Sequence, residues 1–254
     1  MTDQYLTGKT AIVTGAASGI GEAAALLYAE LGANVVVSDI DETKGNTVAA
    51  NIRQLGGQGL FVRTDVSHAP DCEQLVVKAV EAFGSVDIAF NNAGIGGESN
   101  AAGDMSIEGW NNVIAVNLSS VFYCMKYQLL QMEKQGKGVI VNNSSILGSV
   151  GFANACGYAA AKHGIIGLTQ TAALEYSAKG IRINAVGPAF INTPLLTQGG
   201  MNDEVKQSVL VPLHPIGRLG ESKEVAELVV WLSSNKASFI TGSYLPVDGG
   251  YLAR

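Results

Sequence analysis

Ser145, Tyr158 and Lys162 are the residues of this chain whose types and spacing most directly suggest chemistry. Tyr158 and Lys162 are four positions apart in a segment of small residues, and on a helix this spacing places both side chains on one face. An ammonium group beside a phenol stabilises the phenolate and lowers the tyrosine pKa. The pair therefore predicts a group that can donate and accept a proton. Because most Tyr–Lys pairs on helices are structural, this interpretation requires a cofactor site elsewhere in the chain.

The residues needed for a cofactor site occur near the start of the chain. Residues 9–14 are typical of a short buried strand, a turn with Gly15, Gly19 and Gly21 follows it directly, and residues 22–31 have the composition of a helix. Glycines let the backbone approach a pyrophosphate, and the start of a helix offers it free N–H groups. A second predicted strand ends at Asp39, where an acidic residue would bind a ribose 2′-hydroxyl. This arrangement favours a dinucleotide site over a glycine turn without a ligand.

Apolar runs alternate with helical patterns along the whole chain. Strands are predicted at residues 11–13, 35–38, 60–63, 86–90, 139–143, 181–185 and 244–247, and helices at residues 22–31, 42–55, 71–83, 106–133, 158–177 and 223–233. Such alternation predicts a parallel sheet with right-handed crossovers. We therefore expect one α/β domain over residues 1–254, a Rossmann-type doubly wound parallel sheet.

With these motifs in order, the chain resembles the short-chain dehydrogenase/reductase family almost from end to end. The matching segments are residues 14–21, the Asn-Asn-Ala-Gly run at 91–94, Gly-Pro at 187–188 and Asp-Gly-Gly at 248–250. The family's catalytic tetrad matches Asn117, Ser145, Tyr158 and Lys162, and the family's gap to the tyrosine selects Ser145 over Ser144. The resemblance implies hydride transfer between a nicotinamide cofactor and a secondary alcohol or its ketone.

The resemblance also implies a role for each member of the tetrad. Tyr158 would be the general acid in reduction and the base in oxidation, while Lys162 would lower the pKa of Tyr158 and hold the nicotinamide ribose. Ser145 would donate a hydrogen bond to the substrate oxygen. Asn117, a poor helix former inside a predicted helix, would hold a water molecule on a proton relay to Lys162.

The implied cofactor is NAD. Asp39 would repel the 2′-phosphate of NADP, and we expect no compensating basic residue near it, because the glycine turn offers Ala16 and Ala17 and Ile40 follows the aspartate. The residues that the resemblance assigns to cofactor binding are Gly15, Ser18, Gly19, Ile20, Gly21, Asp39, Asp65, Val66, Asn92, Ala93, Gly94, Tyr158, Lys162, Pro188, Ile191 and Thr193.

Residues 190–220 interrupt the alternation of strands and helices, and insertions of this length are typically lids or binding loops. In the resembled family this region closes over the substrate. The candidate substrate-binding residues are Ser145, Leu147, Phe152, Cys156, Tyr158 and Phe190, and further candidate lining residues are Ile95, Leu195 and Leu196. No arginine lies between residues 187 and 211, and the one lysine there, Lys206, follows two acidic residues. We therefore expect an uncharged, moderately apolar alcohol or ketone as the small-molecule substrate.

Composition narrows the class of protein further. With 47% hydrophobic and 15% charged residues and a net charge of −6, the chain is not suited to bind nucleic acid. The start of the sequence lacks a signal-peptide pattern, and the uncharged stretch 138–161 is interrupted by polar residues, so we expect no membrane span. Three cysteines and three histidines without metal-ligand spacing predict neither a disulfide framework nor a metal site. A cytoplasmic enzyme fits best.

Two alternative functions and the oligomeric state of the protein remain as hypotheses. A reductase of oxoacyl groups on acyl carrier protein would need a basic docking surface, and residues 110–131 hold only Lys126 as a basic residue. A dinucleotide-binding regulatory protein without turnover would typically lack part of the tetrad. Apolar residues nearly encircle the helix at 110–131, more than one core face requires. We therefore expect a homotetramer, or at least a dimer.

Overall fold

Valine-rich strands buried on both faces form the centre of the molecule, which the computed structural model describes over residues 4–198 and 202–253. In β2 (Asn34–Asp39) the side chains of Val35 and Val37 enter one apolar core and that of Val36 enters the other. β-branched side chains favour extended backbone, and burial on both faces is typical of a parallel sheet.

The other strands of the described chain are β1 (Thr10–Thr14), β3 (Gln58–Arg63), β4 (Ile88–Asn91), β5 (Gly138–Asn143), β6 (Ile181–Pro188) and β7 (Tyr244–Val247). They form one sheet in the order β3-β2-β1-β4-β5-β6-β7, with every neighbouring pair parallel. The predicted Rossmann-type doubly wound parallel sheet is confirmed. The main differences are at strand ends, since β4 begins at Ile88 rather than at residue 86 and β6 continues to Pro188.

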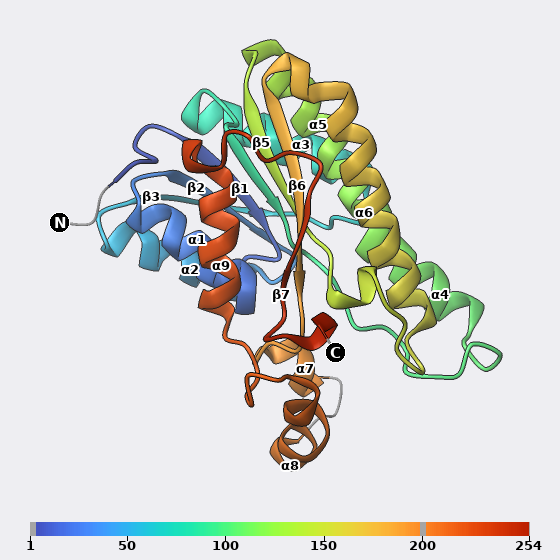
Figure 1. The fold of residues 1–254 in the computed structure, drawn as a ribbon. Coiled ribbons are helices and arrows are strands. Elements are labelled where there is room, and N and C mark those ends of the chain that lie inside the picture. Colours follow the sequence, from blue (N-terminus) through green and yellow to red (C-terminus); the bar gives the residue numbers. More distant parts are fainter. Residues whose placement is uncertain (1–3, 199–201, 254) are drawn as a thin grey trace.

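Helices cover both faces of the sheet (Figure 1). One face carries α1 (Gly19–Glu30), α2 (Glu42–Gln54) and α9 (Ser222–Ser233), and the other carries α3 (Ala69–Phe83), α5 (Ser120–Gln135) and α6 (Cys156–Tyr176). The two apolar cores lie between these layers and the sheet. They hold the strand ends in fixed positions, which is what a site built at those ends requires.

The expected single helix at residues 106–133 is instead two helices joined by a π-helical turn. α4 (Ile107–Ile114) is followed by the π turn Ala115–Ser119 and then by α5. By length and composition this stretch, Ile107–Gln135, could cross a membrane. However, 44% of its most apolar 18-residue part is buried inside the protein, and α5 packs on α3 within the fold. The π turn has a local consequence, because it carries Asn117.

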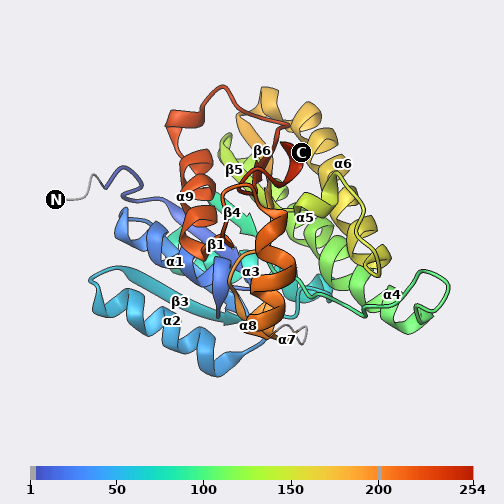
Figure 2. The same cartoon turned by 60° about the horizontal axis from the view of Figure 1, so that its bottom comes forward.

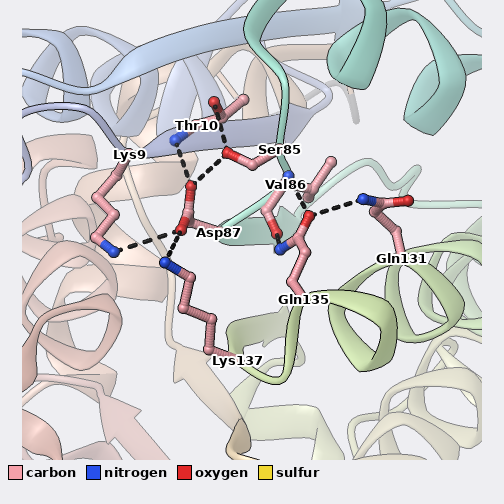
Figure 3. A network of polar contacts seen from close by, with 8 residues as sticks. All are labelled: Lys9, Thr10, Ser85, Val86, Asp87, Gln131, Gln135 and Lys137. Carbon is pink, nitrogen blue, oxygen red and sulfur yellow. Dashed lines mark hydrogen bonds and ion pairs between the residues drawn. The ribbon is translucent and has the colours of Figure 1, made fainter.

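A buried carboxylate joins the amino ends of the central strands (Figure 3). Asp87 precedes β4, and its Oδ2 accepts hydrogen bonds from the backbone N–H of Thr10 (3.1 Å) and the hydroxyl of Ser85 (2.8 Å). The ammonium groups of Lys9 and Lys137 lie 3.4 and 3.7 Å from Oδ1. This network therefore connects the starts of β1, β4 and β5.

The carboxyl ends of the strands lie at the opposite edge, which comes forward in Figure 2. The segment between β6 and α9 projects beyond this edge and contains α7 (Pro194–Gln198), α8 (Asp203–Val205), a π turn at Lys206–Leu210 and a 3-10 turn at Val211–Leu213. Short helices in this segment agree with the expectation of a structured insertion at residues 190–220.

Candidate active site

A cavity of about 600 Å³ lies at the carboxyl ends of the central strands. Strand order reverses beside β1, between β2 and β4, and ligands of open α/β sheets bind at this kind of position. Most of the predicted cofactor residues line the cavity: Gly15, Ser18, Gly19, Ile20, Asp39, Asp65, Val66, Asn92, Ala93, Gly94, Tyr158, Lys162 and Thr193. The fold therefore brings distant segments of the chain together around one cavity.

The glycine turn after β1 is held in place by Thr14 and Asn92. Thr14 Oγ1 accepts the N–H groups of Asn92 (2.9 Å) and Ala93 (3.1 Å), and Asn92 Nδ2 donates to the carbonyls of Thr14 (2.9 Å) and Gly15 (3.2 Å). Gly15 has a φ of 63°, and a Cβ there would lie 2.8 Å from the Cα of Ala93. A Cβ on Gly21 would collide with the Gly15 carbonyl, so Gly21 supports the turn and does not line the cavity.

The start of α1 presents groups suited to a pyrophosphate. Ser18, Gly19 and Ile20 line the cavity, and the side chain of Ser18, the N-cap residue, makes no capping hydrogen bond. The first N–H groups of a helix have no partners within it, and the helix dipole adds partial positive charge there. The residues present therefore fit a dinucleotide whose phosphates lie against this helix end.

Asp39 lines the same cavity at the end of β2. Its Oδ2 accepts the N–H of Ala17 (3.0 Å) and its Oδ1 that of Asp41 (3.0 Å), so the backbone fixes the carboxylate. Lys44, in the first turn of α2, also lines the cavity, and the expectation that no basic residue lies near Asp39 is wrong. Lys44 Nζ is 2.9 Å from Asp41 Oδ2, and this contact is the main cause that raises the pKa of Lys44.

Lys162 is only 3% exposed and reaches the cavity from α6. Its Nζ donates a 2.8 Å hydrogen bond to the Asn143 carbonyl and lies 5.4 Å from the centroid of the Tyr158 ring. Burial lowers the pKa of Lys162 to about 8. Asn143 also lines the cavity, and its buried Oδ1 has no hydrogen-bond partner among the described residues. The site thus combines a buried cation with an unsatisfied acceptor.

The Ser145 side chain lies beside the Tyr158 hydroxyl. Loss of contact with water raises the pKa of Tyr158, and the neighbouring Ser145 hydroxyl opposes this effect without cancelling it. The prediction that Lys162 lowers the pKa of Tyr158 is therefore wrong in this structure, because desolvation dominates and the Lys162 ammonium bonds to Asn143 instead. The Tyr158 hydroxyl consequently stays protonated, the state that a proton donor needs.

Asn117 is fully buried in the π turn before α5. Its Oδ1 accepts the N–H of Ile95 and its Nδ2 donates to the carbonyl of Ile95, both at 2.8 Å. A Cβ on Gly94 would lie 2.7 Å from Asn117 Oδ1 and 3.8 Å from Lys162 Nζ. Asn117 therefore fixes the backbone after β4 next to Lys162, and π turns of this kind are frequent at functional sites.

Ser145 and four other predicted substrate residues lie outside the described lining of this cavity. Leu147 is buried in the turn after β5, and Cys156 Sγ packs 3.2 Å from Met105 Sδ. The rings of Phe152 and Phe190 meet edge to face with centroids 5.7 Å apart. These four lie around Ser145 and Tyr158 in sequence or space, whereas Tyr158, Ile95 and Leu195 of the predicted lining residues do line the cavity.

Besides Gly21, two other predicted cofactor residues lie outside the described lining. The Pro188 carbonyl accepts a 3.4 Å hydrogen bond from the Ser145 hydroxyl, and Ile191 is buried in an isolated bridge with Gly220. The cavity is also lined by residues that the sequence did not indicate: Ala17, Ile40, Asp41, Lys44, Thr64, Ser67, Asn112, Val116, Asn143 and Pro194. These residues reach the cavity through packing that no motif describes.

The sheet, the glycine turn and the Ser–Tyr–Lys arrangement together define an oxidoreductase that uses a nicotinamide dinucleotide. The chain belongs to the short-chain dehydrogenase/reductase family. The family model described as enoyl-(acyl carrier protein) reductase matches residues 15–252.

Similar proteins narrow the reaction. Cyclohexanol dehydrogenase of Acinetobacter sp. (strain SE19) is 48% identical over 246 residues, covering 97% of this chain and 96% of that protein. Cis-4-hydroxycyclohexanecarboxylate dehydrogenase of Sinomonas cyclohexanicum is 44% identical over 245 residues, covering 96% and 97%. The crystal structure of levodione reductase matches with a TM-score of 0.94 at 34% identity, covering 97% and 98%. This chain is therefore an enzyme that interconverts secondary alcohols and ketones.

Proposed function

We propose that the protein is an NAD(H)-dependent dehydrogenase of uncharged alicyclic secondary alcohols. The observation that carries this proposal is the single cavity that reaches from Asp39 to Tyr158 and Lys162. A dinucleotide bound along it would have its adenosine ribose at Asp39 and its nicotinamide near the catalytic tyrosine. The names of the relatives supply the ring in the proposed substrate, since two of them act on six-membered ring alcohols.

The residues of the chain would manage one proton and one oxygen atom. The nicotinamide supplies or accepts the hydride. Tyr158 donates its hydroxyl proton to the carbonyl oxygen in reduction and, as phenolate, accepts the alcohol proton in oxidation. Ser145, beside Tyr158, would turn its single hydroxyl proton from the Pro188 carbonyl to the substrate oxygen, which then accepts one bond from each of the two hydroxyls. Lys162 holds the ribose and Asn117 fixes the loop after β4 beside it.

The preference for NAD follows from the carboxylate of Asp39 in the ribose position, because a 2′-phosphate there would meet like charge. Lys44 could offset this repulsion, but its ammonium is paired with Asp41 at 2.9 Å. We expect Asp39→Ala to reduce the difference in kcat/KM between NAD and NADP. Adding Lys44→Met to this variant should lower the increase in kcat/KM that Asp39→Ala gives with NADP. Higher efficiency with NADPH than with NADH in the unmutated protein would contradict this preference.

The proposed substrate class is tested by comparing kcat/KM for cyclohexanol, cis-4-hydroxycyclohexanecarboxylate, hexan-2-ol and an oxoacyl thioester. Cyclohexanol should give the highest value, because Lys206 is paired with Asp203 (3.5 Å) and residues 187–211 contain no arginine that could bind a carboxylate. The carboxylate substrate tests the charge argument and hexan-2-ol tests the ring. A faster reaction of the thioester would favour the acyl carrier protein alternative.

We also propose that the enzyme is a cytoplasmic homotetramer. Val121, Met125 and Leu129 of α5 are buried in the core, whereas Phe122 and Leu130 on the same helix remain 50% and 49% exposed. Exposed apolar residues on a helix whose other face is already buried are suited to an interface between copies. Light scattering should report a tetramer at micromolar concentration, and a monomer would overturn this assembly.

A further inference from the structure

The hydroxyl of Tyr244, on β7, reaches the active-site turn that follows β5. It donates a 2.8 Å hydrogen bond to the Ser145 carbonyl, across 99 residues of sequence. The Ser149 side chain lies beside the same hydroxyl and partly offsets the effect of burial on its pKa. Ser145 and Ser149 flank the 3-10 turn Ile146–Gly148, so one phenol contacts both ends of this turn. Burial raises the pKa of Tyr244, which keeps its hydroxyl a donor.

The path of this side chain depends on a glycine in β6. The strand β6 lies between β5 and β7, and Tyr244 is in register with Ala185, two residues before Gly187. Directly paired residues of parallel strands point to the same face of the sheet, as do residues two apart. A Cβ on Gly187 would collide with the ring and hydroxyl of Tyr244. Gly187 therefore leaves the space through which Tyr244 crosses β6 to the turn.

The bond from Tyr244 is what ties the Ser145 carbonyl to the sheet. The other hydrogen bond that this carbonyl accepts comes from Gly148 (2.8 Å), which belongs to the same turn. The Ser145 hydroxyl contacts the Pro188 carbonyl at 3.4 Å and accepts the Leu147 N–H at 3.2 Å. The preceding residue, Ser144, donates its N–H to the Val186 carbonyl (2.9 Å) and its hydroxyl to the Lys162 carbonyl (2.8 Å). Without the Tyr244 hydroxyl, the Ser145 backbone would be held through Ser144 before it, and the Ser145 carbonyl by a contact within its own turn.

We propose that Tyr244 is a positioning residue that holds Ser145 in the geometry needed to bond the substrate oxygen and Tyr158. This inference rests on the role of Ser145 in the proposed function. Tyr244 touches neither substrate nor cofactor in this scheme and acts only through the Ser145 turn. Small displacements of a group that orients substrate are costly, since about 1 Å can reduce a rate 10²-fold.

The test compares Tyr244→Phe with Tyr28→Phe, which removes another buried tyrosine hydroxyl bond. Tyr28 bonds Ser233 at 2.7 Å between α1 and α9, away from the cavity. Tyr244→Phe should lower kcat for cyclohexanol oxidation roughly tenfold, as expected for a partial loss of orientation. The NADH dissociation constant should stay unchanged. Both variants should lower the melting temperature, Tyr28→Phe by at least as much as Tyr244→Phe. Tyr28→Phe should nevertheless leave kcat unchanged.

Ser145→Ala and the double variant Ser145→Ala/Tyr244→Phe complete the experiment. If Tyr244 acts through Ser145, adding Tyr244→Phe to Ser145→Ala should change kcat less than twofold, because coupled residues are non-additive. Additive losses would overturn the inference, as would a Tyr244→Phe variant with the kcat of Tyr28→Phe. Full turnover in Ser145→Ala alone would instead contradict the proposed catalytic role of Ser145, and the two failures are therefore distinguishable.

Discussion

The two edges of the sheet use buried polar groups in opposite ways. At the amino edge, the Asp87 carboxylate has four partners, and Gln135 accepts the N–H of Val86 and donates to its carbonyl (Figure 3). At the carboxyl edge, Asn143 has an unpartnered buried oxygen and Lys162 is a buried cation whose pKa is lowered to about 8.

The difference indicates that the polar groups of the amino edge stabilise the fold and that those of the carboxyl edge bind ligands. Burying a polar group is unfavourable unless it is hydrogen-bonded, so satisfied networks stabilise and unsatisfied ones remain at functional sites. The backbone of both edges comes from the same parallel strands. The contrast therefore arises from the side chains and connections at each end, and mutations at the two edges should separate activity from stability.

The largest effect should come from Tyr158→Phe, which removes one hydroxyl and keeps the ring. Turnover should fall at least ~10²-fold, the low end for a general acid–base residue. NADH binding and the melting temperature should stay close to those of the unmutated protein. Steady-state kinetics, fluorescence titration and thermal unfolding measure the three quantities. A variant with near-normal turnover would contradict the assignment of the carboxyl edge as the catalytic site.

Lys162→Met should reduce turnover and also weaken NADH binding, because it removes a charge from the cavity. It should also change the pH dependence of stability. With a folded pKa of about 8 and an unfolded value of ~10.4, the unfolded chain binds more protons between these values, so the free energy of unfolding contributed by Lys162 rises with pH there. The variant should lack this rise in denaturant unfolding of the cofactor-free protein. If the free energy of unfolding depended on pH in the same way in both proteins, the lowered pKa of Lys162 would be contradicted.

Asp87→Asn should act in the opposite sense, lowering stability and leaving activity intact. Loss of the charge-assisted bonds from Ser85, Thr10 and Lys9 should cost about 1–3 kcal/mol in denaturant unfolding. Turnover of the folded protein should change less than twofold, since no atom of this network lines the cavity. A large loss of turnover at full folding would show that the two edges are coupled.

The same variant should change the response to acid. Burial alone would raise the pKa of Asp87, but the bonds from Ser85, the Thr10 N–H and Lys9 outweigh it and hold the pKa below its usual value. The stabilisation is therefore present above the unfolded pKa of ~3.9 and is lost as pH falls through the lower folded value. Asp87→Asn should lack this acid-dependent component.

The smallest effect is expected for Lys137→Met. The Lys137 ammonium is 3.7 Å from Asp87, and its side chain is 62% exposed. Exposed ion pairs typically contribute below ~1 kcal/mol, so its unfolding midpoint should shift less than that of Asp87→Asn. Equal shifts for the two variants would mean that the ion pair, rather than the hydrogen bonds to the backbone and Ser85, stabilises this edge.

Much of the fold could be predicted because its signals are local. Runs of β-branched residues predicted the strands, and the turn at Gly15 and Gly21 predicted a helix after it, although that helix begins at Gly19 rather than at residue 22. The helix expected at residues 106–133 was only partly right, since the π turn at Asn117 divides it. Asn as a poor helix former was the one local sign of this turn, but its pairing with the Ile95 backbone depends on a segment 22 residues away.

By itself the sequence determined the order of the strands and helices, the Tyr158–Lys162 pair on one helix face and the glycine turn, because these follow from spacing along the chain. Tertiary structure alone decided the raised pKa of Tyr158, the cation of Lys44 near Asp39 and the bond from Tyr244 to Ser145. The raised pKa and the Tyr244 bond depend on segments remote in sequence, and desolvation and long-range hydrogen bonds leave no periodic pattern that could have predicted them. Lys44 is only five residues after Asp39, and what the sequence did not show is that the first turn of α2 faces the same cavity.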